Sequence, residues 1–169
     1  KGLAFWSDRF LSDTHSGRDR LLGLALLNME LQMLEPLLVT AEEPRWIETS
    51  VPDVQAAVLR CDKALLVLPV WLGRGTQFVP GQAASQVLEI TIPQAPIGTS
   101  AWEVTTGGVK SLPWSRVAGG MKVKLRDFHL TSAIVVSPDL GASGPIVRLQ
   151  ELQKRNARTA AQWAQELST

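Results

Sequence analysis

The middle of the chain alternates between apolar and polar residues, which predicts β-strands. In residues 121–126 (MKVKLR) and 86–92 (QVLEITI), the apolar side chains fall mainly on one face of an extended chain and the polar ones on the other. Such strands are typical of an antiparallel sheet with one face in water. Residues 64–71 (ALLVLPVW) and 132–137 (SAIVVS) are apolar almost throughout, which predicts central strands covered on both faces, with a bulge or an edge position at Pro69.

Three tight turns divide these runs into hairpins. We expect them at Asp62-Lys63, at Gly107-Gly108 and at Gly119-Gly120. A Gly-Gly pair can supply the positive φ that a two-residue hairpin turn requires. With about five to eight strands at this spacing, the pattern predicts an antiparallel β-sandwich over residues 54–137.

A long apolar helix is predicted before the strands, at residues 21–38. Polar residues such as Asn28 and Glu30 interrupt the apolar stretch, which indicates a buried helix rather than a membrane span. Pro36 should kink or end its last turn. One apolar row can pack on the sandwich, and the other then needs a partner that these residues do not supply. The rows are Leu24, Leu27, Leu31, Leu34 and Leu38, and Leu22, Leu26, Met29, Met33 and Leu37.

The ends of the chain complete the predicted architecture. Residues 2–6 (GLAFW) are typical of a short buried strand, so with the following helix they resemble a βα unit. Residues 40–52 are polar and contain two prolines, which predicts a linker. Residues 146–167 predict a second helix with a basic outer face. We expect a mainly β chain, an antiparallel β-sandwich flanked by an N-terminal βα unit and a C-terminal helix, with boundaries at 1–45, 46–139 and 140–169.

The composition excludes some classes of function but does not identify one. The chain has 169 residues, of which 45% are hydrophobic and 20% charged, so it can bury a core. The net charge of +1 argues against a nucleic-acid module, which needs clustered Lys and Arg. The basic side chains of Lys122, Lys124 and Arg126 are interpreted as a solvated sheet face, offset by acidic neighbours such as Glu89. The single Cys61 excludes an internal disulfide and a multi-cysteine zinc site, and we expect neither metal nor cofactor.

No catalytic constellation stands out in the sequence. His129 lies two residues from Asp127, but no nucleophile pattern accompanies it, and His15 lies in a loop without metal-ligand spacing. Glu30 and Glu35 lie on one predicted helix and do not form the facing carboxylate pair that glycosidases use. We therefore expect these 169 residues to lack hydrolase activity of their own.

The residues after the first predicted strand form a candidate binding site. If residues 2–6 form a barrel strand, Trp6, Asp8 and Arg9 emerge at its carboxyl end, where (β/α)8 enzymes build their active sites. We assign these three as candidate substrate-binding residues. The simpler interpretation is that Trp6 is only part of a core.

Two parts of the sequence resemble a known architecture. GLAFWSDRF followed by RLLGLALLNMELQMLEPLL resembles the last strand and helix of a glycoside-hydrolase-like (β/α)8 barrel. The stretches ALLVLPVWLGRGTQFVPGQAA and SAWEVTTGGVKSLPWSRVAGGMKVKLRDFHLTSAIVVS are similar to the β-sandwich that commonly follows such a barrel, and bacterial proteins of this kind carry similar VAGGMKVKL-type hairpins. The resemblance implies that Trp6 is a sugar-platform residue and that the catalytic carboxylates lie on earlier barrel strands, outside these residues.

This resemblance implies a non-catalytic C-terminal region that packs on and supports a catalytic barrel in a carbohydrate-active, glycosidase-like protein. Two alternatives stay open: a carbohydrate-binding module that uses exposed Trp, and a protein–protein assembly domain that works through its helices. The expected partners are the (β/α)8 barrel of the same polypeptide and a carbohydrate, with neither nucleic acid nor a membrane. The chain starts without Met or a signal-like segment, so we interpret it as part of a longer protein, and its compartment stays open, an exported or periplasmic location included. Two coplanar, solvent-facing tryptophans would favour sugar binding.

Overall fold

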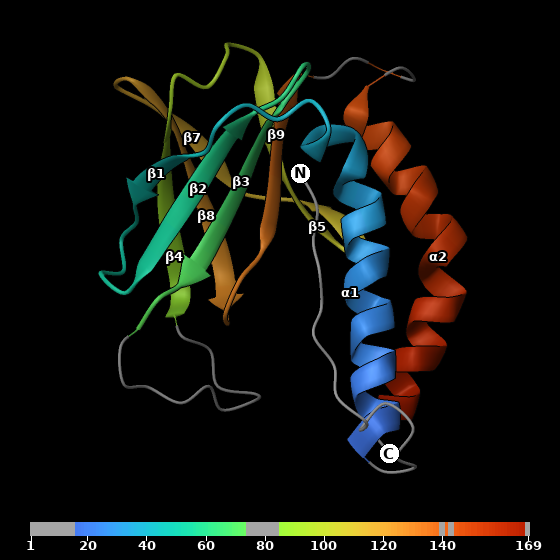
Figure 1. The fold of residues 1–169 in the computed structure, drawn as a ribbon. Coiled ribbons are helices and arrows are strands. Elements are labelled where there is room, and N and C mark those ends of the chain that lie inside the picture. Colours follow the sequence, from blue (N-terminus) through green and yellow to red (C-terminus); the bar gives the residue numbers. More distant parts are fainter. Residues whose placement is uncertain (1–15, 74–84, 139–140, 142–143, 168–169) are drawn as a thin grey trace.

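The structure, a computed structural model, describes residues 16–73, 85–138, 141 and 144–167. Within these residues, nine strands form two antiparallel sheets, with helix α1 (Ser16–Leu38) before them and helix α2 (Pro145–Leu167) after them (Figure 1). The mainly β fold class with flanking helices is therefore confirmed. The predicted strand at residues 2–6 lies outside the described residues.

The nine described strands are divided six to three. The larger, sheet A, has the order β1-β2-β3-β9-β5-β6, and the smaller, sheet B, has the order β4-β8-β7. Every named pair is antiparallel. The bounds are β1 Arg45–Glu48, β2 Val54–Arg60, β3 Leu65–Trp71, β4 Ser85–Pro93, β5 Thr99–Thr105, β6 Gly108–Ser111, β7 Trp114–Val117, β8 Gly120–Phe128 and β9 Ala133–Pro138.

The hairpin turns lie at their predicted positions or one residue earlier. Asp62-Lys63 joins β2 and β3 as predicted. The glycine turns are Thr106-Gly107 and Ala118-Gly119, because the second glycine of each pair is already the first residue of the next strand. Gly119 has a φ of 81° at the second position of its turn, where a type II turn requires a positive φ. Gly120 meets a different requirement, since a Cβ there would collide with the backbone at the end of β4.

The predicted linker at residues 40–52 contains strand β1, so that prediction was wrong. All four residues of β1 pair with β2. Three of them are exposed, and only Ile47 packs against the sandwich core. A short edge strand with so few buried side chains leaves no alternation in the sequence to reveal it.

The sandwich core lies between the two sheets, and its inward residues are the predicted ones. Side chains from β4 and β8 meet those of β2, β3 and β9 in one buried cluster. Glu89 and Lys124 lie on the opposite, wetter face of sheet B. The predicted alternation of β4 and β8 is therefore confirmed. The inward residues are Leu88, Ile90 and Ile92 of β4 and Met121, Val123 and Leu125 of β8.

Strands β3 and β9 are central and covered on both faces, as predicted. Val67 packs into the sandwich, whereas the neighbouring Leu66 packs beneath the helices. The ladder between β3 and β9 ends at Val67 and resumes as an isolated bridge at Val70 in the same register. Pro69 keeps its pairing with β2 but lies in the interrupted part of the ladder to β9. Its missing amide proton therefore costs no hydrogen bond to β9.

The two helices cover the outer face of sheet A, so the described chain has three layers: sheet B, sheet A and a helix pair (Figure 1). An ion pair of 2.7 Å between Arg18 and Glu166 joins the helices. The basic outer face predicted for α2 is exposed at Arg148, Lys154, Arg155 and Arg158. The helix-layer core comprises Met33, Leu34 and Leu37 of α1, Ile146 and Leu149 of α2, and Leu66, Val104 and Val135 of sheet A, with other small side chains.

Helix α1 buries one of its two apolar rows and leaves most of the other open. Its last turn contains Pro36, and the helix ends two residues later, in agreement with the prediction. By length and composition alone, residues 17–38 could also cross a membrane. In this structure 28% of that span is buried, and its C-terminal part packs on sheet A and α2 through Met33, Leu34 and Leu37. The buried row is Leu22, Met29, Met33 and Leu37, whereas in the other row only Leu34 is buried and Leu27 is 40% exposed.

Candidate functional site

A large apolar groove of about 1210 Å³ lies between α1 and the outer face of sheet A. We call it the α1 groove. The open row of α1 forms one wall, and side chains of β2, β3 and β5 and of the segment before β9 form the other. Its main apolar residues are Leu27, Leu31, Leu34 and Leu38 of α1, Leu59 of β2 and Leu68 of β3.

The register of sheet A explains why strand residues join this wall. Leu59 pairs with Leu66, and Leu68 lies two residues further along β3. All three side chains therefore project from the same face of the sheet, the face that the helices cover. The sequence revealed the helical wall but not Leu59 and Leu68, because a strand's own pattern does not tell which part of its face a helix will leave open.

The charged residues that line the α1 groove are all acidic. Glu30 and Glu35 come from α1, whereas Glu103 of β5 pairs with the sandwich-core residue Ile134, so its side chain projects from the opposite face of sheet A. The carboxylate of Glu103 accepts a hydrogen bond of 3.0 Å from the hydroxyl of Ser132. Burial raises the pKa of Glu30, and a hydrogen bond from the backbone of Thr106 partly opposes that rise. The groove is therefore apolar with an acidic character.

Replacing Glu30 with Gln is expected to stabilise the fold at neutral pH and to do so less in acid. The carboxyl's folded pKa lies above its usual value of 4.5, so the wild type loses stability as the pH rises from the unfolded pKa through the folded one. Well below pH 4.5 both states are protonated, and the difference vanishes. Water screens this half-buried group, so the gain near pH 7 should stay below about 1 kcal/mol.

Urea denaturation of wild type and Glu30→Gln near pH 4 and pH 7 measures this difference. The matched control is Glu35→Gln, which removes the same charge at an exposed position of the same helix. An equal effect of Glu30→Gln at both pH values would contradict the account.

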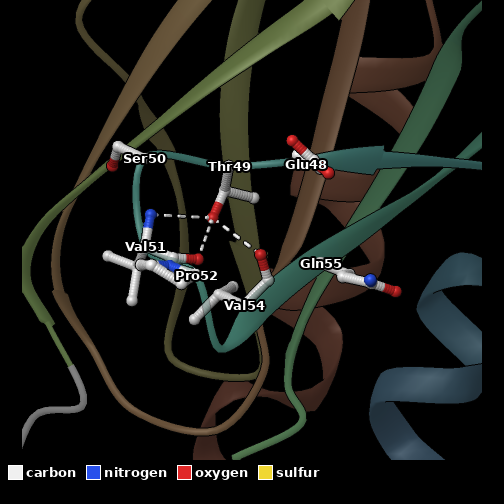
Figure 2. Close-up of a pocket in the computed structure, with 7 residues that line it drawn as sticks. All are labelled: Glu48, Thr49, Ser50, Val51, Pro52, Val54 and Gln55. Atoms are coloured by element: carbon white, nitrogen blue, oxygen red, sulfur yellow. Dashed lines mark hydrogen bonds between the residues drawn. The ribbon is translucent and has the colours of Figure 1, made fainter.

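A second, smaller hollow of about 260 Å³ lies at the turn between β1 and β2. Figure 2 shows the hydroxyl of Thr49 at its centre, where it accepts a hydrogen bond from the amide of Val51. The same hydroxyl lies 2.8 Å from the carbonyl oxygen of Val54. The next residue, Ser50, exchanges hydrogen bonds with the backbone of Glu89 in β4. These contacts hold a loop to both sheets, which is a structural role.

Most of the candidate site residues singled out from the sequence lie outside the part of the chain that the structure describes. Trp6, Asp8, Arg9 and His15 lie outside the described residues. His129 is exposed in the loop between β8 and β9. No group of three or more His, Cys, Asp or Glu in the described ranges is placed to hold a metal ion.

The exposed tryptophans of the described chain lie on different faces. Trp46 in β1 is 54% exposed and pairs with Ala57, so it projects from the helix-bearing side of sheet A. Trp114 in β7 is 42% exposed and pairs with Val123, so it projects toward the sandwich interior at the edge of sheet B. These two rings therefore do not form one flat platform.

The basic residues of β8 are partly neutralised by their neighbour in β4. Glu89 lies 3.0 Å from the ammonium of Lys122 and 2.6 Å from that of Lys124. Hydrogen bonds from these two lysines hold the pKa of Glu89 below its usual range. Their contacts agree with the interpretation of a solvated, charge-balanced sheet face.

Comparisons of the chain with protein-family models, with curated proteins and with solved structures found no match.

Proposed function

We propose that this chain is a non-catalytic packing module of a carbohydrate-active, glycosidase-like protein and that it supports a (β/α)8 barrel domain through the α1 groove. The observation that carries the proposal is the open apolar row of α1. Leu27 is 40% exposed and Val39 is 76% exposed at this wall. Burying a fully exposed Leu or Val side chain is worth roughly 1.5–3 kcal/mol, and a packed neighbour here gains the share of that free energy that belongs to the surface still exposed.

The chemistry of the groove supports packing over catalysis. Its walls are mainly leucine, valine and alanine side chains, and Glu103 is already held by Ser132. The outer ring of a (β/α)8 barrel consists of helices. Helices pack on one another by fitting ridges of side chains into grooves, so an outer helix of a barrel has the shape that the open row of α1 can accept.

A carbohydrate-binding module is less well supported. Sugar rings stack on flat aromatic surfaces, and a platform needs aromatic rings that share a face. Trp46 and Trp114 project from different faces of different sheets. An assembly domain that binds another protein would use the same α1 groove, and it differs from our proposal only in whether the partner belongs to the same polypeptide.

Binding of the dye 8-anilinonaphthalene-1-sulfonate to the full chain tests the proposal. The wild type should enhance dye fluorescence, because its open apolar row gives the dye a dry surface. The double variant Leu27→Gln, Leu31→Gln should lose most of that signal, since both side chains line the groove. The matched control is Val87→Thr, at a 49% exposed position on β4, and it should keep the signal.

Two results would contradict the packing function. One is a wild type that binds no dye, and the other is equal dye binding by the groove variant and the control. Retardation of the wild type in gels that contain soluble polysaccharide, if Trp46→Ala abolished it, would favour the carbohydrate-binding alternative.

A further inference from the structure

The α1 groove is acidic as well as apolar, and this combination identifies the chemistry of its partner. We propose that the groove binds an amphipathic helix that carries Lys or Arg beside its apolar stripe. The inference rests on the proposed packing function and adds the charge and the secondary structure of the partner.

The charges of the lining support a basic partner. Glu30 and Glu35 belong to α1 and line the groove beside its apolar row. The lining within the described chain includes no Lys, Arg or His. An apolar partner alone would bury these carboxylates further without a counter-charge, which is costly. A Lys or Arg beside the partner's apolar stripe supplies that charge, and such complementarity also selects against acidic partners.

The floor of the groove supports a helical partner. Strand β2 pairs with β1 and β3, and β3 pairs with β2 and β9, so the floor presents side chains and no free strand edge. A partner strand would leave its own backbone groups without partners, whereas a helix satisfies them internally. The wall from Leu27 to Leu38 is about 16–17 Å long at 1.5 Å per residue, which fits roughly three turns of a partner helix.

Two fluorescein-labelled synthetic helices test the inference on the full chain. They share one leucine stripe and differ only in their flanks, which are Lys in one and Glu in the other. The Lys-flanked peptide should bind about tenfold more tightly than the Glu-flanked peptide, because charge complementarity favours one and like charge opposes the other. This preference should weaken as salt is added.

Matched variants test whether Glu30 and Glu35 cause the preference for the Lys-flanked peptide. The double variant Glu30→Gln, Glu35→Gln should reduce the ratio of the two affinities to about twofold, with most of the charge contribution removed. Glu151→Gln, at an exposed position of α2 outside the groove, should leave the ratio unchanged. Circular dichroism of each variant checks that the fold is retained.

The outcomes separate this inference from the packing function. Equal binding of both peptides, lost in Leu27→Gln, Leu31→Gln, would overturn the basic partner and leave the packing function standing. Binding of neither peptide and of no dye would overturn both. Binding to phosphatidylcholine vesicles in place of the peptides would overturn the inference in favour of a lipid occupant. Peptide binding that occurs only after removal of residues 1–15 would instead assign the groove to the chain's own N-terminal segment.

Discussion

Gly120→Ala is expected to destabilise the fold by roughly 3 kcal/mol, near the upper end of single substitutions. Gly120 begins β8 and pairs with Pro93 and Val117 at the same time. A Cβ at this position would collide with the carbonyl oxygen of Ile92 and come within 3.1 Å of the Cα of Pro93. Both contacts are backbone atoms of β4, so sheet B itself would have to shift. Urea denaturation measures the loss as a fall in the free energy of unfolding.

The control is the equivalent glycine of the other Gly-Gly pair. Gly108 also begins a strand directly after a turn, but a Cβ there would meet no atom within 4 Å. Gly108→Ala should therefore change stability by no more than about 0.5 kcal/mol. Similar losses for the two substitutions would show that the close approach of β4 and β8 is not what requires glycine at the start of β8.

The second large effect is a difference in stability between alanine substitutions in the two apolar rows of α1. Met33→Ala should cost roughly 2–5 kcal/mol, because the side chain is 1% exposed and its removal leaves a cavity in the helix-layer core. Leu27→Ala should cost less than about 1 kcal/mol, because Leu27 faces the open groove and Ala keeps the helix propensity. Both free energies come from urea denaturation of the full chain. Equal costs would contradict the assignment of one row to the core and the other to a partner.

The sandwich was predictable because its signals are local. In β4 and β8 each inward residue is apolar and lies two positions from the next, so the pleat alone places Ile90 and Val123 in the core. The runs that became β3 and β9 are apolar on both faces because each strand is covered twice, once by sheet B and once by the helices. A strand buried on both faces therefore appears in the sequence as a continuous apolar run.

The features that escaped prediction depend on contacts between distant parts of the chain. Strand β1 is held by its pairing with β2 and buries little, so its residues resemble a linker. The turn before β8 lies one residue earlier than predicted because Gly120 already belongs to β8, where the backbone of Ile92 in β4 leaves no room for a Cβ. No local rule about turns contains that information.

The sequence predicted one wall of the candidate site, the open face of α1, but not the opposite wall. The two rows of α1 indicated that one helix face would remain without a partner in these residues, and the open Leu27 row is that face. The opposite wall, with Leu59 and Leu68, came from the register of β2 and β3 and from where the helices stop covering the sheet.

Thiol labelling at two positions of α1 tests the central claim most directly. The single native Cys61 is buried, and burial raises the pKa of its thiol, so it should react slowly in the native chain. In separate variants, Leu27→Cys should react with 5,5′-dithiobis(2-nitrobenzoic acid) at close to the rate of an exposed thiol, whereas Met33→Cys should stay as slow as Cys61. Protection of both new thiols would show that the groove is already filled, and fast reaction of both would show that α1 is not part of the core.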